Sequence, residues 1–395
     1  MLIFMKRKVF MIKRNIILLW GIALLQGLVF YAPVATLYRQ AAGLGIFHIT
    51  LIESISLWLT ICLEIPWGWA ADRIGYRRTM LICCVLYFVS KLVFWQAEGF
   101  PGFLLERILL SVVCAGLSGV DSAMLYLSCG EEDTHRVFSV YENLGQAGML
   151  LAAGIHGWWI GENYRLAAFL TAVSYGAAAL LCLGLRDVPG EPEQGTGFAF
   201  GKVLTVLQGQ LGNRRVLLLL LAVGLFNESH QTITVFLSQL QYIRSGMSHR
   251  AVSLAYILVN AAALCGGLSA AICRKTGAKR MGLGLILTAG LGCLLLGLFP
   301  VPFLSVLAVL LLRVAFSLMQ PLHMDLQNKL VTTRDRATAL SMNAVVTDGL
   351  GIFLNLLFGR IAQWDLPAAM YLGAALCGVS AVLYRCSFTE KDSIA

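Results

Sequence analysis

Twelve apolar runs of about twenty residues or more recur along the whole chain and limit its fold more than any other feature. A helix of about twenty apolar residues crosses the hydrocarbon core of a bilayer. The runs do not alternate apolar and polar residues, as the strands of outer-membrane barrels do. We therefore predict an all-α polytopic membrane protein with twelve transmembrane helices, at about 15–38, 48–71, 79–97, 101–128, 138–161, 165–185, 215–243, 249–273, 280–299, 301–328, 337–363 and 367–386.

Composition excludes a soluble protein. Hydrophobic residues make up 58% of the chain and charged residues 13%, against about 25% charged in an average soluble domain. The eleven cysteines lie mostly inside apolar runs without metal-ligand or redox spacing, so we interpret them as small core residues and expect no metal site. The stretch from Asn15 to Tyr38 is too long for the apolar region of a signal peptide, so we expect an uncleaved first helix.

The basic residues predict the orientation in the membrane. With the N-terminus inside, 22 of the 30 Lys and Arg residues lie in cytoplasmic segments and four in the opposite loops. This bias places both termini in the cytoplasm. Because this placement accounts for the net charge of +9, we expect no nucleic-acid partner. We expect the protein to lie in the plasma (inner) membrane.

Short matches between the two halves predict an internal repeat. Gly75–Arg78 matches Gly277–Arg280 at an offset of 202 residues, and Arg107–Ser111 matches Arg313–Ser317 at an offset of 206. A third match joins residues 136–143 and 336–343. We predict two six-helix bundles, 1–185 and 215–395, joined by a cytoplasmic linker, 186–214, which is rich in glycine and proline. Transporters built from such repeats place the substrate at the repeat interface.

The loop after the second run resembles the signature loop of the major facilitator superfamily, Gly-x-x-x-Asp-Arg-x-Gly followed by basic residues. The matching positions are Gly68, Asp72, Arg73, Gly75, Arg77 and Arg78. The resemblance implies a gate in which the Asp72 carboxylate meets the helix N-terminus near Arg336 and Ala337, where exposed amides favour an anion. The second half has Arg274 in place of Asp72, so we expect only one such latch.

Two further runs resemble a drug-exporter-like subgroup of the family. Arg107 matches the buried arginine of proton-driven efflux members, and Ser118–Tyr126 is similar to a motif of their fourth helix. In the fifth run, however, Ala152 and Ala153 replace the Gly-Pro pair of the exporters. Glu106 leaves the helix about 100° away from Arg107, so we expect the partner of Arg107 on another helix.

Ionisable residues inside the runs are candidates for substrate binding and proton coupling, because each costs a few kcal/mol if it faces lipid. Asp121 and Glu142 are coupling candidates of the first half. Glu228 lies near mid-depth in the seventh run, close to His230. The polar cluster around Glu228 is the best substrate-site candidate of the second half. The complete set of candidates is Asp121, Glu142, Glu228, His230, Asp325 and Arg107.

We therefore expect a secondary transporter that works by alternating access and exports amphipathic, drug-like compounds in exchange for protons. The alternative is an uptake symporter or facilitator for a sugar, organic acid or peptide-like metabolite. The chain lacks a phosphate-binding loop and the motifs of hydrolases, so we expect no enzyme and no cofactor, and energy from a proton gradient. The expected partners are a small-molecule substrate and the lipid bilayer, with the chain as a monomer.

Overall fold

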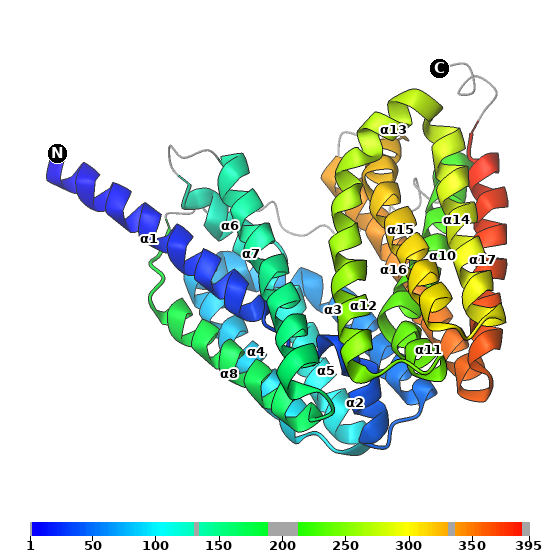
Figure 1. The fold of residues 1–395 in the computed structure, drawn as a ribbon. Coiled ribbons are helices and arrows are strands. Elements are labelled where there is room, and N and C mark those ends of the chain that lie inside the picture. The colour runs from blue at the N-terminus through cyan, green and yellow to red at the C-terminus, as the bar shows by residue number, and fades with distance from the viewer. Residues whose placement is uncertain (1, 130–133, 189–211, 331–335, 389–395) are drawn as a thin grey trace. The chain divides into compact units, whose positions relative to one another are not determined.

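A computed structural model of the protein describes residues 2–129, 134–188, 212–330 and 336–388. Every regular element in these ranges is a helix (Figure 1). Eleven helical segments of the described chain are long and apolar enough to span a membrane. The remaining predicted span, 138–161, falls on α7 (Thr134–Ile155) and its π-helical continuation η2 (His156–Ile160), whose first half is rich in polar residues. The predicted all-α fold is confirmed.

The chain forms two compact units, and the first comprises residues 1–44 and 55–195. Helix α3 (Ile46–Ile74) begins in the second unit and ends in the first. The remaining elements of the first unit are α1 (Leu2–Gly27), η1 (Ala32–Val34), α2 (Ala35–Ala41), α4 (Tyr76–Gln96), α5 (Gly99–Leu117), α6 (Val120–Leu127), α7, η2 and α8 (Tyr164–Leu183).

The second unit comprises residues 45–54 and 196–395. Its first helix continues through a π-helical segment, η3, that starts one turn after Glu228. The elements are α10 (Arg214–Gln231), η3 (Thr232–Leu237), α11 (Ser238–Arg244), α12 (His249–Ala261), η4 (Ala262–Leu268), α13 (Ser269–Thr276), α14 (Ala278–Leu298), α15 (Pro302–Leu330), α16 (Arg336–Trp364) and α17 (Leu366–Cys386).

The two units repeat the same helix start at the positions that the sequence matches. Gly75 precedes α4 with φ 90° and ψ 146°, and Gly277 precedes α14 with φ 78° and ψ 148°. Only glycine adopts this region of backbone conformation without strain. Both following helices are 21 residues long. The two units therefore share the backbone conformation of this turn as well as its sequence.

The first span is interrupted between α1 and η1. Side chains of α8 satisfy the backbone groups that this break releases: Tyr175 donates to the Gln26 carbonyl over 2.7 Å and Ser174 to the Leu25 carbonyl over 2.6 Å. The Phe30 amide donates to the Thr171 hydroxyl at 3.0 Å. Since a bilayer core offers no water to such groups, these side chains of α8 stabilise the break.

Helices α1 and α7 approach each other closely at glycines. A Cβ added to Gly27 would meet the Gly145 carbonyl, and one added to Gly148 would meet the Leu24 carbonyl. Small residues permit this contact between helix backbones in a membrane. The packing holds the polar face of α7 in place within the first unit.

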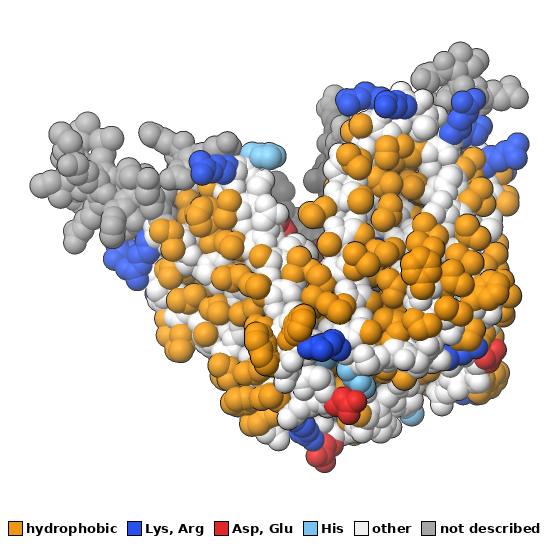
Figure 2. Space-filling model, in the orientation of Figure 1, with side chains coloured by type: hydrophobic (Ala, Val, Ile, Leu, Met, Phe, Trp, Pro, Cys, Tyr) orange, Lys and Arg blue, Asp and Glu red, His pale blue; other side chains and the backbone are white. Residues whose placement is uncertain are grey.

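The outer surface of the helices is hydrophobic, as a lipid-facing surface requires. Figure 2 shows apolar side chains spread over the second unit, with Lys and Arg gathered near α13. The exposed large apolar residues there include Leu254, Leu258, Leu264, Leu287, Leu291 and Phe303.

Candidate functional site

Glu228, on α10 of the second unit, is the predicted site residue that lies in a buried hydrogen-bonded network between two helices. Its side chain is 8% exposed. The Thr232 hydroxyl lies 2.6 Å from Glu228 Oε1 and 2.9 Å from Asn355 Oδ1 of α16. A hydroxyl carries one hydrogen, so it donates to only one of these oxygens at a time. The three side chains form a buried network with spare acceptor capacity.

The chain geometry at this network is unusual. Thr232 is the first residue of the π-helical segment η3, and Glu228 lies four residues earlier on α10. A π-bulge widens the helix and is frequent at functional sites. Two further acids, Glu53 on α3 and Asp348 on α16, lie within electrostatic range of Glu228. The Glu228 network thus combines hydroxyl, amide and carboxylate groups.

A separate polar contact involves Asn227, the residue before Glu228 on α10. Gln320 on α15 donates to Asn227 Oδ1 at 3.4 Å. Hydroxyl and amide side chains of this kind bind hydroxyl groups and heteroatoms of uncharged polar ligands. Neither the Thr232 nor the Asn355 side chain has a charge, which is why the search for ionisable residues in the sequence missed both.

His230, the other candidate on α10, is buried at 1% exposure and stacks on Phe316, with ring centroids 3.9 Å apart. Neither ring nitrogen of His230 has a hydrogen-bond partner within the described ranges. Arg313 lies over the other aromatic ring, with its guanidinium carbon 6.0 Å from the Phe316 centroid. His230 is therefore held by ring packing, apart from the Glu228 network.

Asp325 occupies a different environment on α15. It accepts from Lys329 at 2.7 Å, one turn later, and the two side chains are 52% and 70% exposed. An exposed pair of this spacing contributes little to stability. The structure thus does not bring Asp325 into the Glu228 network.

Asp121 joins two helices of the first unit. Its Oδ1 accepts from the Ser122 amide at 2.6 Å, in the first turn of α6, and its Oδ2 accepts from the Tyr141 hydroxyl of α7 at 3.4 Å. A carboxylate in the first turn of a helix is stabilised by the free amides there. This environment fits a helix-to-helix contact as well as it fits proton coupling.

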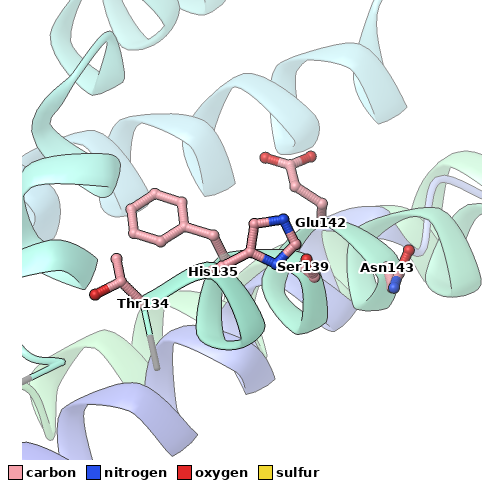
Figure 3. A pocket seen from close by; sticks show the side chains of 6 residues that line it. Thr134, His135, Ser139, Glu142 and Asn143 are labelled. Carbon is pink, nitrogen blue, oxygen red and sulfur yellow. The ribbon is translucent and has the colours of Figure 1, made fainter. Parts of the chain in front are cut away.

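Glu142 lines a pocket of about 650 Å³ on α7. Figure 3 shows the side chains of His135 and Glu142 extending from the same side of the helix. The lining residues, one face of α7, are Thr134, His135, Phe138, Ser139, Glu142 and Asn143. Glu142 is thus an exposed acid at an open pocket, not a buried charge.

The signature loop is only partly described. Arg77 donates from Nε to the Leu185 carbonyl at 2.6 Å and lies 3.7 Å from Asp187, so it ties the loop to the end of α8. Gly68, Arg73 and Arg78 are exposed. The side chains of Asp72, Arg336 and Ala337 lie outside the described part of the structure, so the proposed latch stays a prediction.

A buried ion pair that the sequence reasoning missed lies between α4 and α5. Lys91 Nζ is 3.3 Å from Glu106 Oε1 and 3.1 Å from the Tyr31 hydroxyl, and the two charged side chains are 4% and 0% exposed. Lys91 is five residues before the end of α4 and Glu106 seven after the start of α5. In an antiparallel hairpin, these distances from the turn place Lys91 and Glu106 at similar depth. Comparing Glu106 only with Arg107 misses this pairing. Arg107 is partly buried on α5.

Comparison with known proteins bears on the whole architecture. The family model described as Major Facilitator Superfamily matches residues 17–356. A search of curated proteins finds no significant match.

Three solved structures illustrate the similarity of fold. A point mutant of the nucleoside transporter NupG is 16% identical with a TM-score of 0.84, over 95% of this chain and 100% of its own. The bacterial homologue of the human lysosomal transporter Spinster is 15% identical with a TM-score of 0.72, over 95% and 97%. A D-xylose-proton symporter is 16% identical with a TM-score of 0.68, over 93% and 97%.

Proposed function

The chain belongs to the Major Facilitator Superfamily, and we propose that it is a proton-coupled uptake transporter for a small, uncharged, hydroxyl-bearing metabolite of the nucleoside class. A secondary transporter of this family binds its substrate within the membrane and is not an enzyme. The proposal therefore depends on the polar groups that the helices bury.

The Glu228 network carries the proposal. Glu228, Thr232 and Asn355 form a buried set of hydrogen-bonding side chains at the start of a π-helical segment. A carboxylate accepts two hydrogen bonds from adjacent hydroxyl groups, and an amide can both donate and accept. A ribose-like diol offers these two adjacent donors, whereas an apolar drug offers none.

The neighbours in fold agree with this substrate class. The structure with a TM-score of 0.84 is named a nucleoside transporter, and another is named a D-xylose-proton symporter. Both of the named solutes carry several hydroxyl groups. Another neighbour is named a peptide transporter of the POT family, so the fold alone does not select among these substrate classes. The choice of substrate class therefore depends on the Glu228 network.

Export of a drug-like compound is the second candidate function. The motif at Ser118–Tyr126 favours it, because it resembles an exporter motif of the fourth helix. Ala152 and Ala153, both fully buried on α7, argue against it, because the exporters have Gly-Pro at these positions. We place it second for this reason.

A counterflow experiment separates the two candidates. Proteoliposomes loaded with unlabelled uridine are diluted into labelled uridine, with D-xylose, dialanine or ethidium as competitors. The proposal predicts exchange of uridine that nucleosides inhibit and ethidium does not. Exchange of ethidium in the absence of uridine exchange would favour the drug exporter instead.

A further inference from the structure

The Lys91–Glu106 pair in the first unit is a buried charge site that the Glu228 network does not use. Lys91 comes from α4 and Glu106 from α5. Taking such charges out of water costs several kcal/mol per ion, so a pair of this kind stabilises a fold weakly at best. Hydrophobic residues of similar volume would fill the same space at less cost. Stability therefore does not explain the pair, and we look for its role in transport.

The two members of the pair are not equally satisfied. Lys91 has the Tyr31 hydroxyl at 3.1 Å, and its ammonium lies 5.8, 5.2 and 5.5 Å from the ring centroids of Tyr31, Tyr87 and Tyr175. Aromatic rings at this range stabilise a cation. Lys91 thus keeps favourable partners for its charge whatever the state of Glu106.

Glu106 has fewer partners for its charge than Lys91 has. Its Oε1 accepts from Lys91, and Oε2 is buried without a hydrogen-bond partner among the residues described. A buried acceptor without a partner carries an unfavourable desolvation free energy. Of the two charged groups, only Lys91 has aromatic partners in the described chain in addition to the ion pair.

The pair also contacts the break in the first span. Tyr31 belongs to the non-α-helical stretch between α1 and α2 and stacks on Phe94, with ring centroids 4.1 Å apart. Interrupted helices are where secondary transporters bind their substrates and coupling ions. A change of charge at Glu106 would therefore act, through Lys91 and Tyr31, on a segment whose backbone is also bonded to side chains of α8.

We propose that Glu106 is the proton-binding residue of the first unit, with Lys91 and its tyrosine cage as the fixed cation beside it. The proposal rests on the proton coupling of the proposed function. One proton binds to the free carboxylate oxygen, Oε2, on the side of higher proton activity and leaves on the other side. The titratable groups that act on Lys91 are Glu106, Tyr31 and Tyr87. Tyr175 and Cys114 act on these tyrosines, and Arg107 follows Glu106 in the sequence.

Two measurements on the full-length protein test the proposal. In proteoliposomes, Glu106→Gln should lower the proton-driven accumulation of uridine at least tenfold while uridine counterflow stays within threefold of wild type. Glu98→Gln is the matched control, because Glu98 is an exposed acid paired with Arg165, and it should keep both activities. Full proton-driven accumulation by Glu106→Gln would overturn the proposal, and so would an equal loss of accumulation and counterflow, since that marks a structural role.

The second measurement needs no substrate and separates this proposal from the proposed function. Infrared difference spectra between acid and neutral pH should show a carboxylic-acid carbonyl band in the wild type and in Glu98→Gln that is absent in Glu106→Gln. If Glu106→Gln does not fold, the double variant Lys91→Met/Glu106→Gln, which removes both charges, replaces it. An unchanged band in the variant lacking Glu106 overturns the proposal even where uridine is not transported.

Discussion

Thr232 donates a hydrogen bond of 2.6 Å to Glu228, four residues earlier, at the point where α10 gives way to the π-helical segment η3. The same hydroxyl lies 2.9 Å from Asn355 Oδ1 on α16. Thr232 thus links a buried acid to a buried amide on another helix. This hydroxyl orients the Glu228 carboxylate, which the proposed function assigns to substrate binding.

Removal of the Thr232 hydroxyl tests this arrangement. Thr232→Val keeps the shape of the side chain but leaves Glu228 without its donor, and a hydrogen bond to a charged group contributes about 1.5–3 kcal/mol. We expect the KM for uridine uptake to rise about tenfold or more. Thr234→Val is the control in the same π-helical segment, because the Thr234 hydroxyl is buried without a hydrogen-bond partner in the described chain. Equal effects of the two variants would contradict the assignment.

The break in the first span makes a prediction about stability. Thr171→Val removes the acceptor of the buried Phe30 amide, and an unpaired buried donor costs about 1–3 kcal/mol. We expect a lower unfolding temperature in detergent. Thr288→Val is the control, since the Thr288 hydroxyl bonds to the Gly284 carbonyl of its own helix. Equal unfolding temperatures of the two variants would contradict a stabilising role of α8 at the break.

The close approach of α1 and α7 predicts that two alanine substitutions on one helix have opposite effects. Gly148→Ala places a methyl group against the Leu24 carbonyl, so the helix backbones have to separate. Gly154→Ala, on the same helix, meets nothing within 4 Å and gains helix propensity of up to about 1 kcal/mol. Thermal unfolding should show destabilisation by the first substitution alone. A stable Gly148→Ala variant would exclude tight glycine packing.

The signature loop allows a similar comparison. Gly75 has φ 90° and ψ 146°, a conformation that costs other residues about 1–3 kcal/mol. Gly68 lies inside α3 with open space around the position of a Cβ. We expect Gly75→Ala to lower the unfolding temperature and Gly68→Ala to preserve it. The reverse order would show that the turn conformation is not what requires glycine at position 75.

The sequence allowed the helical architecture to be predicted because its signals are local. Apolar runs of the right length identify spans, and the Gly75 and Gly277 turns match at a constant offset because both units need the same backbone conformation. The break after Gly27 is different. It depends on hydroxyl groups of α8 about 140 residues later in the chain, and no local pattern reveals that partnership.

The candidate site was predictable only where a charge marked it. Glu228 stood out as an acid in an apolar run, whereas Asn355 is neutral and joins it only through the packing of α16 against α10. Lys91 and Glu106 were both visible in the sequence as ionisable residues. Their pairing depends on the hairpin of α4 and α5, which brings two positions at similar depth together.

The most direct test of the proposed function is uridine uptake into proteoliposomes under an imposed pH gradient. Proton-coupled uptake predicts that an acidic exterior raises the initial rate at least tenfold and drives labelled uridine above its equilibrium concentration, and that a protonophore abolishes both effects. Glu228→Gln should lose most of this accumulation. Uptake that is equal with and without the gradient, or that is faster with an acidic interior, would contradict the account.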